Sequence, residues 1–124
     1  MSRKITGPAR FYYATCYSLQ GIKAAYCNEP AFRYESWAAL LMLPLSVFIA
    51  ETGMQLAALA GTVLIVLIFE LLNTAIEAVV DRAGTEYNEL AGLAKDLGSA
   101  AVFVMLIITA ITWAGVLWDN GWLG

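Results

Sequence analysis

The sequence contains no histidine and only two cysteines among its 124 residues. Without histidine, the chain can hold neither a His-ligated metal site nor a Ser-His-Asp triad, and it cannot form a phosphohistidine. The two cysteines, Cys16 and Cys27, are isolated and lack the spacing of zinc ligands. We therefore expect them to be small apolar residues of a protein in a reducing compartment.

Charged residues are also scarce. They make up only 14% of the chain, whereas hydrophobic residues make up 60%. A soluble domain of this length needs more charge to stay dispersed, so the composition favours a membrane protein organised as one compact unit. The net charge of -3 is mild and no basic patch is present, so we expect no nucleic-acid partner.

Three long stretches contain no charged residue at all, namely residues 36–50, 52–69 and 97–118. A membrane-spanning helix needs about 20 mostly apolar residues. The sequence therefore predicts transmembrane helices and a cytoplasmic loop at these positions: about 31–50, 55–80 and 97–118 for the helices, and 81–96 for the loop. Pro44 lies within the first helix, where proline is tolerated when neighbouring groups satisfy the freed carbonyl.

A further helix is predicted before these spans, over about 8–28. Apolar side chains recur there at spacings of three and four, opposite polar ones; the apolar set is Phe11, Thr15, Leu19, Ile22 and Tyr26. This pattern is typical of an amphipathic helix that lies in the membrane interface. The predicted fold class is thus an all-α membrane protein with one interfacial helix and three transmembrane helices.

The basic residues predict the orientation. Five precede the first span and two lie between the second and third: Arg3, Lys4, Arg10, Lys23 and Arg33, then Arg82 and Lys95. All seven fall on one side of a three-span topology. By the positive-inside rule, the N-terminus and the second loop are cytoplasmic and the C-terminus lies on the opposite side.

The second span carries a polar face formed by Glu70, Asn73, Glu77 and Asp81. At about 100° per residue, the four side chains fall within an arc of roughly 80°. Glu77 and Asp81 alone could mark a solvated helix end. Glu70 and Asn73 lie deeper, where an ionised group costs on the order of 3 kcal/mol and usually marks a functional site. These carboxylates could bind a divalent cation, move a proton, or do both.

Each polar residue has a plausible chemical role. Glu29 and Glu77 could hold Mg²⁺ together with waters and phosphate oxygens. Glu70 would suit a general base acting on a hydroxyl, and Asn73 could orient either group by hydrogen bonds. Lys95 adds a cation for phosphate, and Asp96 adds another acceptor. No Gly-x-x-x-x-Gly-Lys loop or protein-kinase motif set is present, so any nucleotide would bind by an unrelated arrangement.

Two segments, "ELLNTAIEAVVDRAGTEYNELAGLAKDLGSAA" and "NEPAFRYE", resemble the bacterial integral-membrane diacylglycerol kinases, which are related to the undecaprenol kinases. The likeness covers essentially the whole chain. It implies a homotrimer of the bacterial inner membrane, with active sites shared between subunits. Such a protein transfers the γ-phosphate of MgATP to the free hydroxyl of diacylglycerol and gives phosphatidic acid.

The resemblance also implies roles for individual residues. Glu70 would be the general base, with Asn73 and Ser99 near the reacting groups, and Glu29 and Glu77 would hold Mg²⁺. The nucleotide site would comprise Arg10, Tyr17, Glu29, Glu77, Glu86, Tyr87, Asn88, Lys95 and Asp96. The lipid would contact Arg10, Glu70, Ser99 and Trp113. The chain departs from familiar relatives at Leu19, Gln20, Pro30 and Asn88, which leaves lipid preference more open than reaction type.

Three other functions remain open at this point. Undecaprenol presents one hydroxyl at the interface as diacylglycerol does, and no residue decides between the two acceptors. A small proton-coupled transporter subunit would also need a deep glutamate such as Glu70, but it does not explain the cytoplasmic cluster. A purely structural membrane subunit leaves the polar cluster unexplained.

Overall fold

The computed structural model describes residues 6–84 and 86–124, which form four α-helices. Arg3 and Lys4, which contributed to the predicted orientation, lie outside the described residues. The helices are α1 (Ala9–Asn28), α2 (Pro30–Ile49), α3 (Gly53–Arg82) and α4 (Glu89–Asp119). This confirms the predicted all-α fold with three long apolar helices after a first, separate helix.

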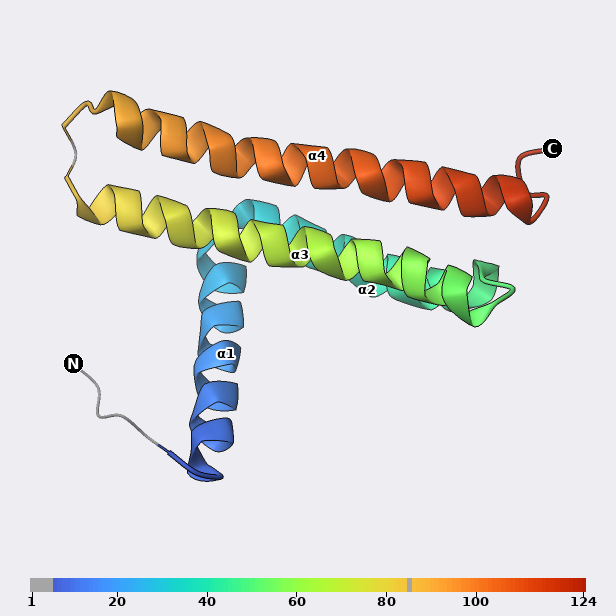
Figure 1. The fold of residues 1–124 in the computed structure, drawn as a ribbon, viewed down its shortest axis with the longest axis horizontal. Helices are drawn as coiled ribbons and strands as arrows, with labels where there is room; N and C mark the ends of the chain where they lie inside the picture. The colour runs from blue at the N-terminus through green and yellow to red at the C-terminus, as the bar shows by residue number, and fades with distance from the viewer. Residues whose placement is uncertain (1–5, 85) are drawn as a thin grey trace.

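The helices α2, α3 and α4 lie lengthwise beside one another, whereas α1 lies across them (Figure 1). The change of direction occurs at Glu29, whose backbone is extended between the two helices. Pro30 follows it as the first residue of α2, and a residue before proline avoids the helical conformation. The Glu29–Pro30 pair therefore ends α1 and starts α2 in a new direction.

Side-chain caps start the two longest helices. The Thr52 hydroxyl accepts a hydrogen bond from the backbone N–H of Gln55 at the start of α3, at 3.1 Å. The Asn88 carbonyl accepts one from the N–H of Ala91 at the start of α4, at 3.0 Å. Such caps satisfy N–H groups that have no partner within the helix.

The cap at Asn88 makes α4 longer than predicted. The sequence predicted a loop over 81–96, but α3 continues to Arg82 and α4 already begins at Glu89. The absence of charge was used to place the span, and a helix can begin with charged residues before it becomes apolar. Residues 89–96 are mostly good helix formers, and Glu89 lies favourably in the first turn.

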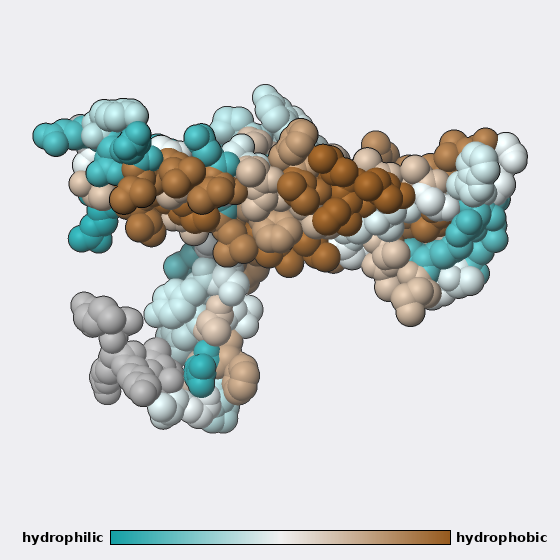
Figure 2. Space-filling model, turned by 45° about the horizontal axis from the view of Figure 1, so that its top comes forward, coloured by the Kyte–Doolittle hydropathy of each residue, from teal (hydrophilic) through white to brown (hydrophobic). Residues whose placement is uncertain are grey.

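Three helices, α2, α3 and α4, are long and apolar enough to cross a membrane. At 1.5 Å per residue the 30 residues of α3 extend about 45 Å, whereas the apolar part of a bilayer is about 30 Å thick. Figure 2 shows hydrophobic residues in a band along the middle of these helices and hydrophilic residues towards their ends. Pro44 lies inside α2, as predicted.

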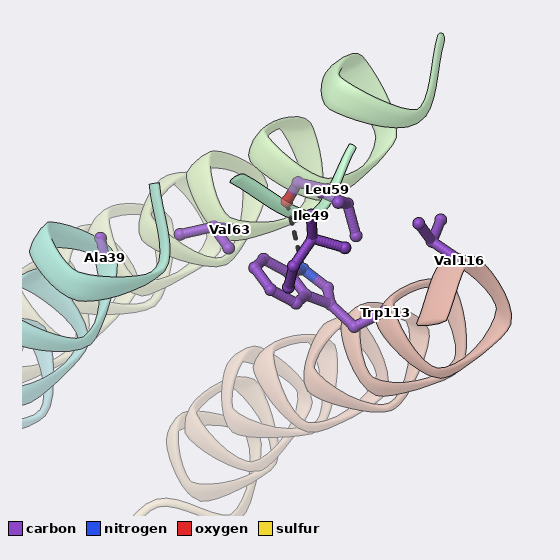
Figure 3. Packing of buried hydrophobic residues seen from close by; sticks show 6 residues of the cluster. All are labelled: Ala39, Ile49, Leu59, Val63, Trp113 and Val116. Carbon is purple, nitrogen blue, oxygen red and sulfur yellow. Dashed lines mark hydrogen bonds between the residues drawn. The ribbon is translucent and has the colours of Figure 1, made fainter. Parts of the chain in front are cut away.

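A buried hydrophobic cluster joins these three helices near the α2–α3 turn (Figure 3); it comprises Ala39, Ile49, Leu59, Val63, Trp113 and Val116. The indole N–H of Trp113 donates to the carbonyl of Leu59 at 3.2 Å, which links α4 to α3. Outside this cluster many large apolar side chains face outward, including Leu40 at 76% and Phe48 at 73% exposed. A bilayer or another subunit would cover such surfaces.

An amide pair closes the same end of the molecule. Asn120 donates from Nδ2 to the carbonyl of Ile49 at 2.9 Å and accepts from Gln55 Nε2 at 2.9 Å. The end of α4 is thereby held against the α2–α3 turn. These contacts set the position of α4 along α3, and with it the relation of their polar ends.

Candidate active site

The polar face of α3 continues the stripe that forms the core. Leu59, Val63 and Val66 are buried at helical spacing, and Glu70 follows them one turn later with only 7% of its surface exposed. The periodicity that packs the apolar residues therefore also carries this carboxylate inward. A buried carboxylate is expensive unless it is paired, protonated or functional, so Glu70 is the centre of the candidate site.

Asn73 and Glu77 extend this face towards the polar end of α3, and both are half-buried. The Asn73 amide donates from Nδ2 to Glu77 Oε1 at 3.2 Å. This hydrogen bond joins residues four apart along one helix face. The predicted alignment of Glu70, Asn73 and Glu77 is therefore present, with Asn73 and Glu77 directly bonded.

Other carboxylates approach Glu70 from the start of α2. Glu29, at the α1–α2 junction, and Glu35, on α2, lie close enough to repel its charge, as does Glu77. Four carboxylates thus share one corner of the molecule. Like charges this close oppose one another, and a bound cation would offset the repulsion.

The donor set fits a divalent ion that is shared with a phosphate ligand. Within residues 6–84 and 86–124, no group of three or more histidine, cysteine or carboxylate side chains is arranged to hold a metal alone. Mg²⁺ in phosphoryl-transfer sites usually takes one or two carboxylates and completes its coordination with waters and substrate phosphates. Glu29 and Glu77 both act on the charge of Glu70, and their role as a metal pair stays a prediction.

The polar ends of α3 and α4 are joined by an ion pair. Lys95 Nζ lies 2.6 Å from Asp81 Oδ1, and both side chains are substantially exposed. Asp96 and Ser99 follow on α4, and both are exposed. Lys95 is therefore placed beside α3, where a phosphate group could replace Asp81 as its partner.

The α3–α4 connection brings together three residues that were predicted for the nucleotide site. Glu86, Tyr87 and Asn88 line a hollow of about 780 Å³ between the end of α3 and the start of α4. The Tyr87 ring is 91% exposed and is free to stack on a ligand. The carbonyl of Asn88 caps α4, so its amide nitrogen is the group left for a ligand.

Two residues that were predicted for the nucleotide site lie far from the α3–α4 connection in a single chain. Arg10 and Tyr17 are exposed on α1, and the beginning of α1 projects away from the other helices (Figure 1). The second half of α1 does face α3 across a groove of about 550 Å³, which includes Ser18, Asn28 and Glu29 on one side and Thr74 on the other. Glu29 therefore joins this groove to the carboxylate corner.

Trp113 belongs to the core cluster and lies deeper than the polar groups. Together with Glu35 it also lines an apolar cavity of about 260 Å³ between α2, α3 and α4, along with Met42, Val63, Val66 and Thr109. This cavity has a carboxylate among apolar walls. Ser99 does not line it; its side chain is exposed on α4.

Two residues near the site were missed from the sequence. Glu35 lies within the predicted helix 31–50, just before the first uncharged stretch, and was not considered as part of the carboxylate group. Arg33 donates to the carbonyl oxygens of Tyr26 and Cys27, both at 3.0 Å, at the end of α1. Its signal was the segment "NEPAFRYE", in which an arginine follows the helix break by a few residues.

Comparison with known proteins identifies the family of this chain. The model of the family described as "Prokaryotic diacylglycerol kinase" matches residues 16–117. A diacylglycerol kinase of Haemophilus influenzae is 49% identical over 92% of this chain and 97% of its own length. Those of Escherichia coli K12 and Pseudomonas aeruginosa are 45% and 42% identical, over 97% and 90% of this chain and 98% and 91% of their own lengths.

Proposed function

The chain belongs to the prokaryotic diacylglycerol kinase family, and we propose that it transfers the γ-phosphate of MgATP to the free hydroxyl of diacylglycerol. The products would be phosphatidic acid and MgADP. Relatives named diacylglycerol kinase match this chain over nearly its whole length, so the polar groups can be interpreted as parts of one kinase site.

The observation that carries the proposal is the burial of Glu70 within range of the charges of Glu29, Glu35 and Glu77. A carboxylate at the inner edge of a polar corner can accept the proton of a lipid hydroxyl. The hydroxyl oxygen then forms a bond to the γ-phosphorus as the bond to the β–γ bridging oxygen breaks. The proton stays on Glu70 and the electron pair leaves with ADP.

The other residues of the site would hold the nucleotide. Glu29 and Glu77 would bind Mg²⁺ together with phosphate oxygens, and the ion would neutralise charge on the transferring group. Lys95 would contact a phosphate after leaving Asp81. The exposed side chains of Glu86, Tyr87 and Asn88 would contact the nucleoside part, with Asp96 nearby.

The site also implies an orientation and an assembly. Arg33, Arg82 and Lys95 all lie near the end of the helices that carries the carboxylates, so this end would face the cytoplasm of a bacterial inner membrane. Arg10 and Tyr17 stand apart from the remaining site residues in one chain. A homotrimer in which α1 of one subunit reaches a neighbour's site would unite them, and would cover the outward-facing apolar surfaces.

The decisive experiment measures phosphate transfer from labelled MgATP to diacylglycerol in mixed micelles, with undecaprenol in parallel. Glu70→Gln is the test variant, and Glu51→Gln is the matched control because Glu51 is an exposed carboxylate in the α2–α3 turn. We expect labelled phosphatidic acid from the wild type and from Glu51→Gln, but not from Glu70→Gln.

The other outcomes separate the alternatives. Label on undecaprenol alone would mean that the protein is a lipid kinase whose acceptor is undecaprenol and not diacylglycerol. Transfer to neither lipid by a folded protein would refute the proposed kinase activity. Proton flux in sealed vesicles without ATP would then be the next measurement, since a transporter needs no nucleotide.

A further inference from the structure

Gly98 on α4 differs from every other described glycine in how closely it is approached. A Cβ atom built there would overlap Asn73 Oδ1 and would lie 3.3 Å from Asn73 Cγ and 3.5 Å from Ile76 Cδ1. At Gly92 and Gly115, on the same helix, an added Cβ would have no neighbour within 4 Å. Gly98 is therefore where the backbone of α4 makes room for a side chain of α3.

The side chain that fills this room is held in one orientation. Asn73 donates from Nδ2 to Glu77 Oε1 at 3.2 Å, while its Oδ1 is buried against α4 without a hydrogen-bond partner among the described residues. The reverse orientation would put Oδ1 against the Glu77 carboxylate, where two acceptors would face each other. A buried acceptor without a partner is destabilising, so a gain elsewhere must offset it.

We infer that Gly98 is a positioning residue for the kinase site. Its lack of a side chain leaves room for the Asn73 amide oxygen against α4, and this directs Nδ2 at the Glu77 carboxylate. Glu77 is thereby held in one rotamer with one oxygen engaged and the other available to a metal–nucleotide ligand. The packing of Asn73 against Gly98 is argued from the contacts alone. The effect of Gly98 on turnover rests on the proposed function.

Replacing Gly98 should disturb the site more than the fold. The atom that a Cβ would meet is the end of a side chain, which can rotate away without moving the backbone. Alanine is also a better helix former than glycine. Gly98→Ala should therefore fold and displace the Asn73 amide, so that the hydrogen bond to Glu77 is lost.

The first test observes the amide directly, without metal or nucleotide. Labelling the four asparagines, Asn28, Asn73, Asn88 and Asn120, with ¹⁵N gives four side-chain amide signals, and loss of one signal in Asn73→Ala assigns Asn73. We expect the Asn73 signal to move in Gly98→Ala and to stay in place in the control Gly115→Ala. An unmoved Asn73 signal in folded Gly98→Ala would overturn the inference.

The second test measures the consequence for the site. Loss of a group that orients a metal ligand typically costs 10–100-fold in metal affinity or activity. We expect Gly98→Ala to weaken Mg²⁺ binding or turnover by about this factor, with Gly115→Ala unchanged. In an Asn73→Ala background, Gly98→Ala should cost nothing further. An equal loss in both backgrounds would show that Gly98 does not act through Asn73.

Two further measurements separate a failure of the inference from misfolding of the variant and from a failure of the proposed function. If Gly98→Ala does not fold, the wild type still decides: a nuclear Overhauser contact between the Asn73 side-chain amide and Gly98 supports the packing, and its absence refutes it. If the wild type phosphorylates no lipid, the proposed function fails. The amide signals then still decide whether Gly98 holds Asn73 on Glu77.

Discussion

Lys95 Nζ on α4 lies 2.6 Å from Asp81 Oδ1 at the end of α3, across the short connection between the two helices. The side chains are 42% and 65% exposed, so water screens the pair and it adds little to stability. Its more important effect is on the position of Lys95. The ammonium group is held beside the polar face of α3. A phosphate group that enters the site could replace Asp81 as its partner.

The first prediction compares the two partners of this ion pair. Lys95→Ala should raise the KM for ATP about 10-fold or more, because a charged hydrogen bond to phosphate is lost. Asp81→Asn should leave the KM unchanged or lower it, because Lys95 no longer has to exchange partners. Steady-state kinetics against ATP and thermal unfolding check both variants. A similar rise in KM for the two would mean that Asp81 also contributes to nucleotide binding.

The second prediction separates the buried Glu70 from the half-buried Glu77 on α3. Glu70→Gln removes a base and should lower kcat by about 10²–10⁴-fold while MgATP still binds. Glu77→Gln should weaken Mg²⁺ binding as well, because it removes one of the two charges that would hold the ion. Glutamine at 77 keeps an acceptor for Asn73, so the contact of Asn73 with Gly98 should remain.

Equilibrium binding of a labelled nucleotide, with and without Mg²⁺, distinguishes these two effects. Glu51→Gln, at the other end of α3, controls for loss of a carboxylate in general. Near-normal turnover in both test variants would refute the assigned roles.

The third prediction concerns Trp113, which is buried and donates to the carbonyl of Leu59. Trp113→Phe keeps an aromatic ring in the core but removes the donor, at a cost of about 0.5–1.5 kcal/mol. That carbonyl still accepts from the Thr62 hydroxyl at 3.0 Å, so no acceptor is left bare. We expect the melting temperature to fall by a few degrees with little change in the KM for diacylglycerol. A large rise in that KM would show that the indole N–H itself contacts the lipid.

The helices could be predicted from sequence because hydropathy and helix-breaking residues are properties of short segments of the chain. Pro30 and the uncharged stretches located α2, α3 and the apolar part of α4. The beginning of α4 was placed too late because residues 89–96 are charged and apolar in turn, and the absence of charge is no criterion for a helix start. The Asn88 cap was the better signal.

The candidate site could be predicted only along single elements. The helical period placed Glu70, Asn73 and Glu77 on one face, and burial of Glu70 followed from the same period. The approach of Glu35, the contact of Gly98 with Asn73 and the ion pair of Lys95 depend on how helices pack. Such pairings are set by tertiary contacts, for which one sequence holds no local pattern.

The fourth prediction concerns the corner between α1 and α2, which Arg33 holds. Its guanidinium donates to the carbonyls of Tyr26 and Cys27, two of the groups that a helix end leaves without partners. Trp37 adds a hydrogen bond from its indole N–H to the Tyr26 hydroxyl at 2.9 Å. The direction of α1, and hence the position of Glu29 at the α1–α2 junction, depends on this corner.

Arg33→Ala should therefore raise the KM for MgATP about 10-fold, because Glu29 and the groups on α1 lose their fixed positions. Arg33→Lys should recover only part of the loss, since an ammonium group lacks the planar fork that spans two carbonyls. Lys23→Ala is the matched control, because it removes an exposed cation from α1 and leaves both hydrogen bonds of Arg33 in place. Spin labels on α1 and α4 would show a broader distance distribution in Arg33→Ala than in the wild type or the control. If that distribution stayed narrow while the KM rose, Arg33 would act on the nucleotide directly and not through the direction of α1.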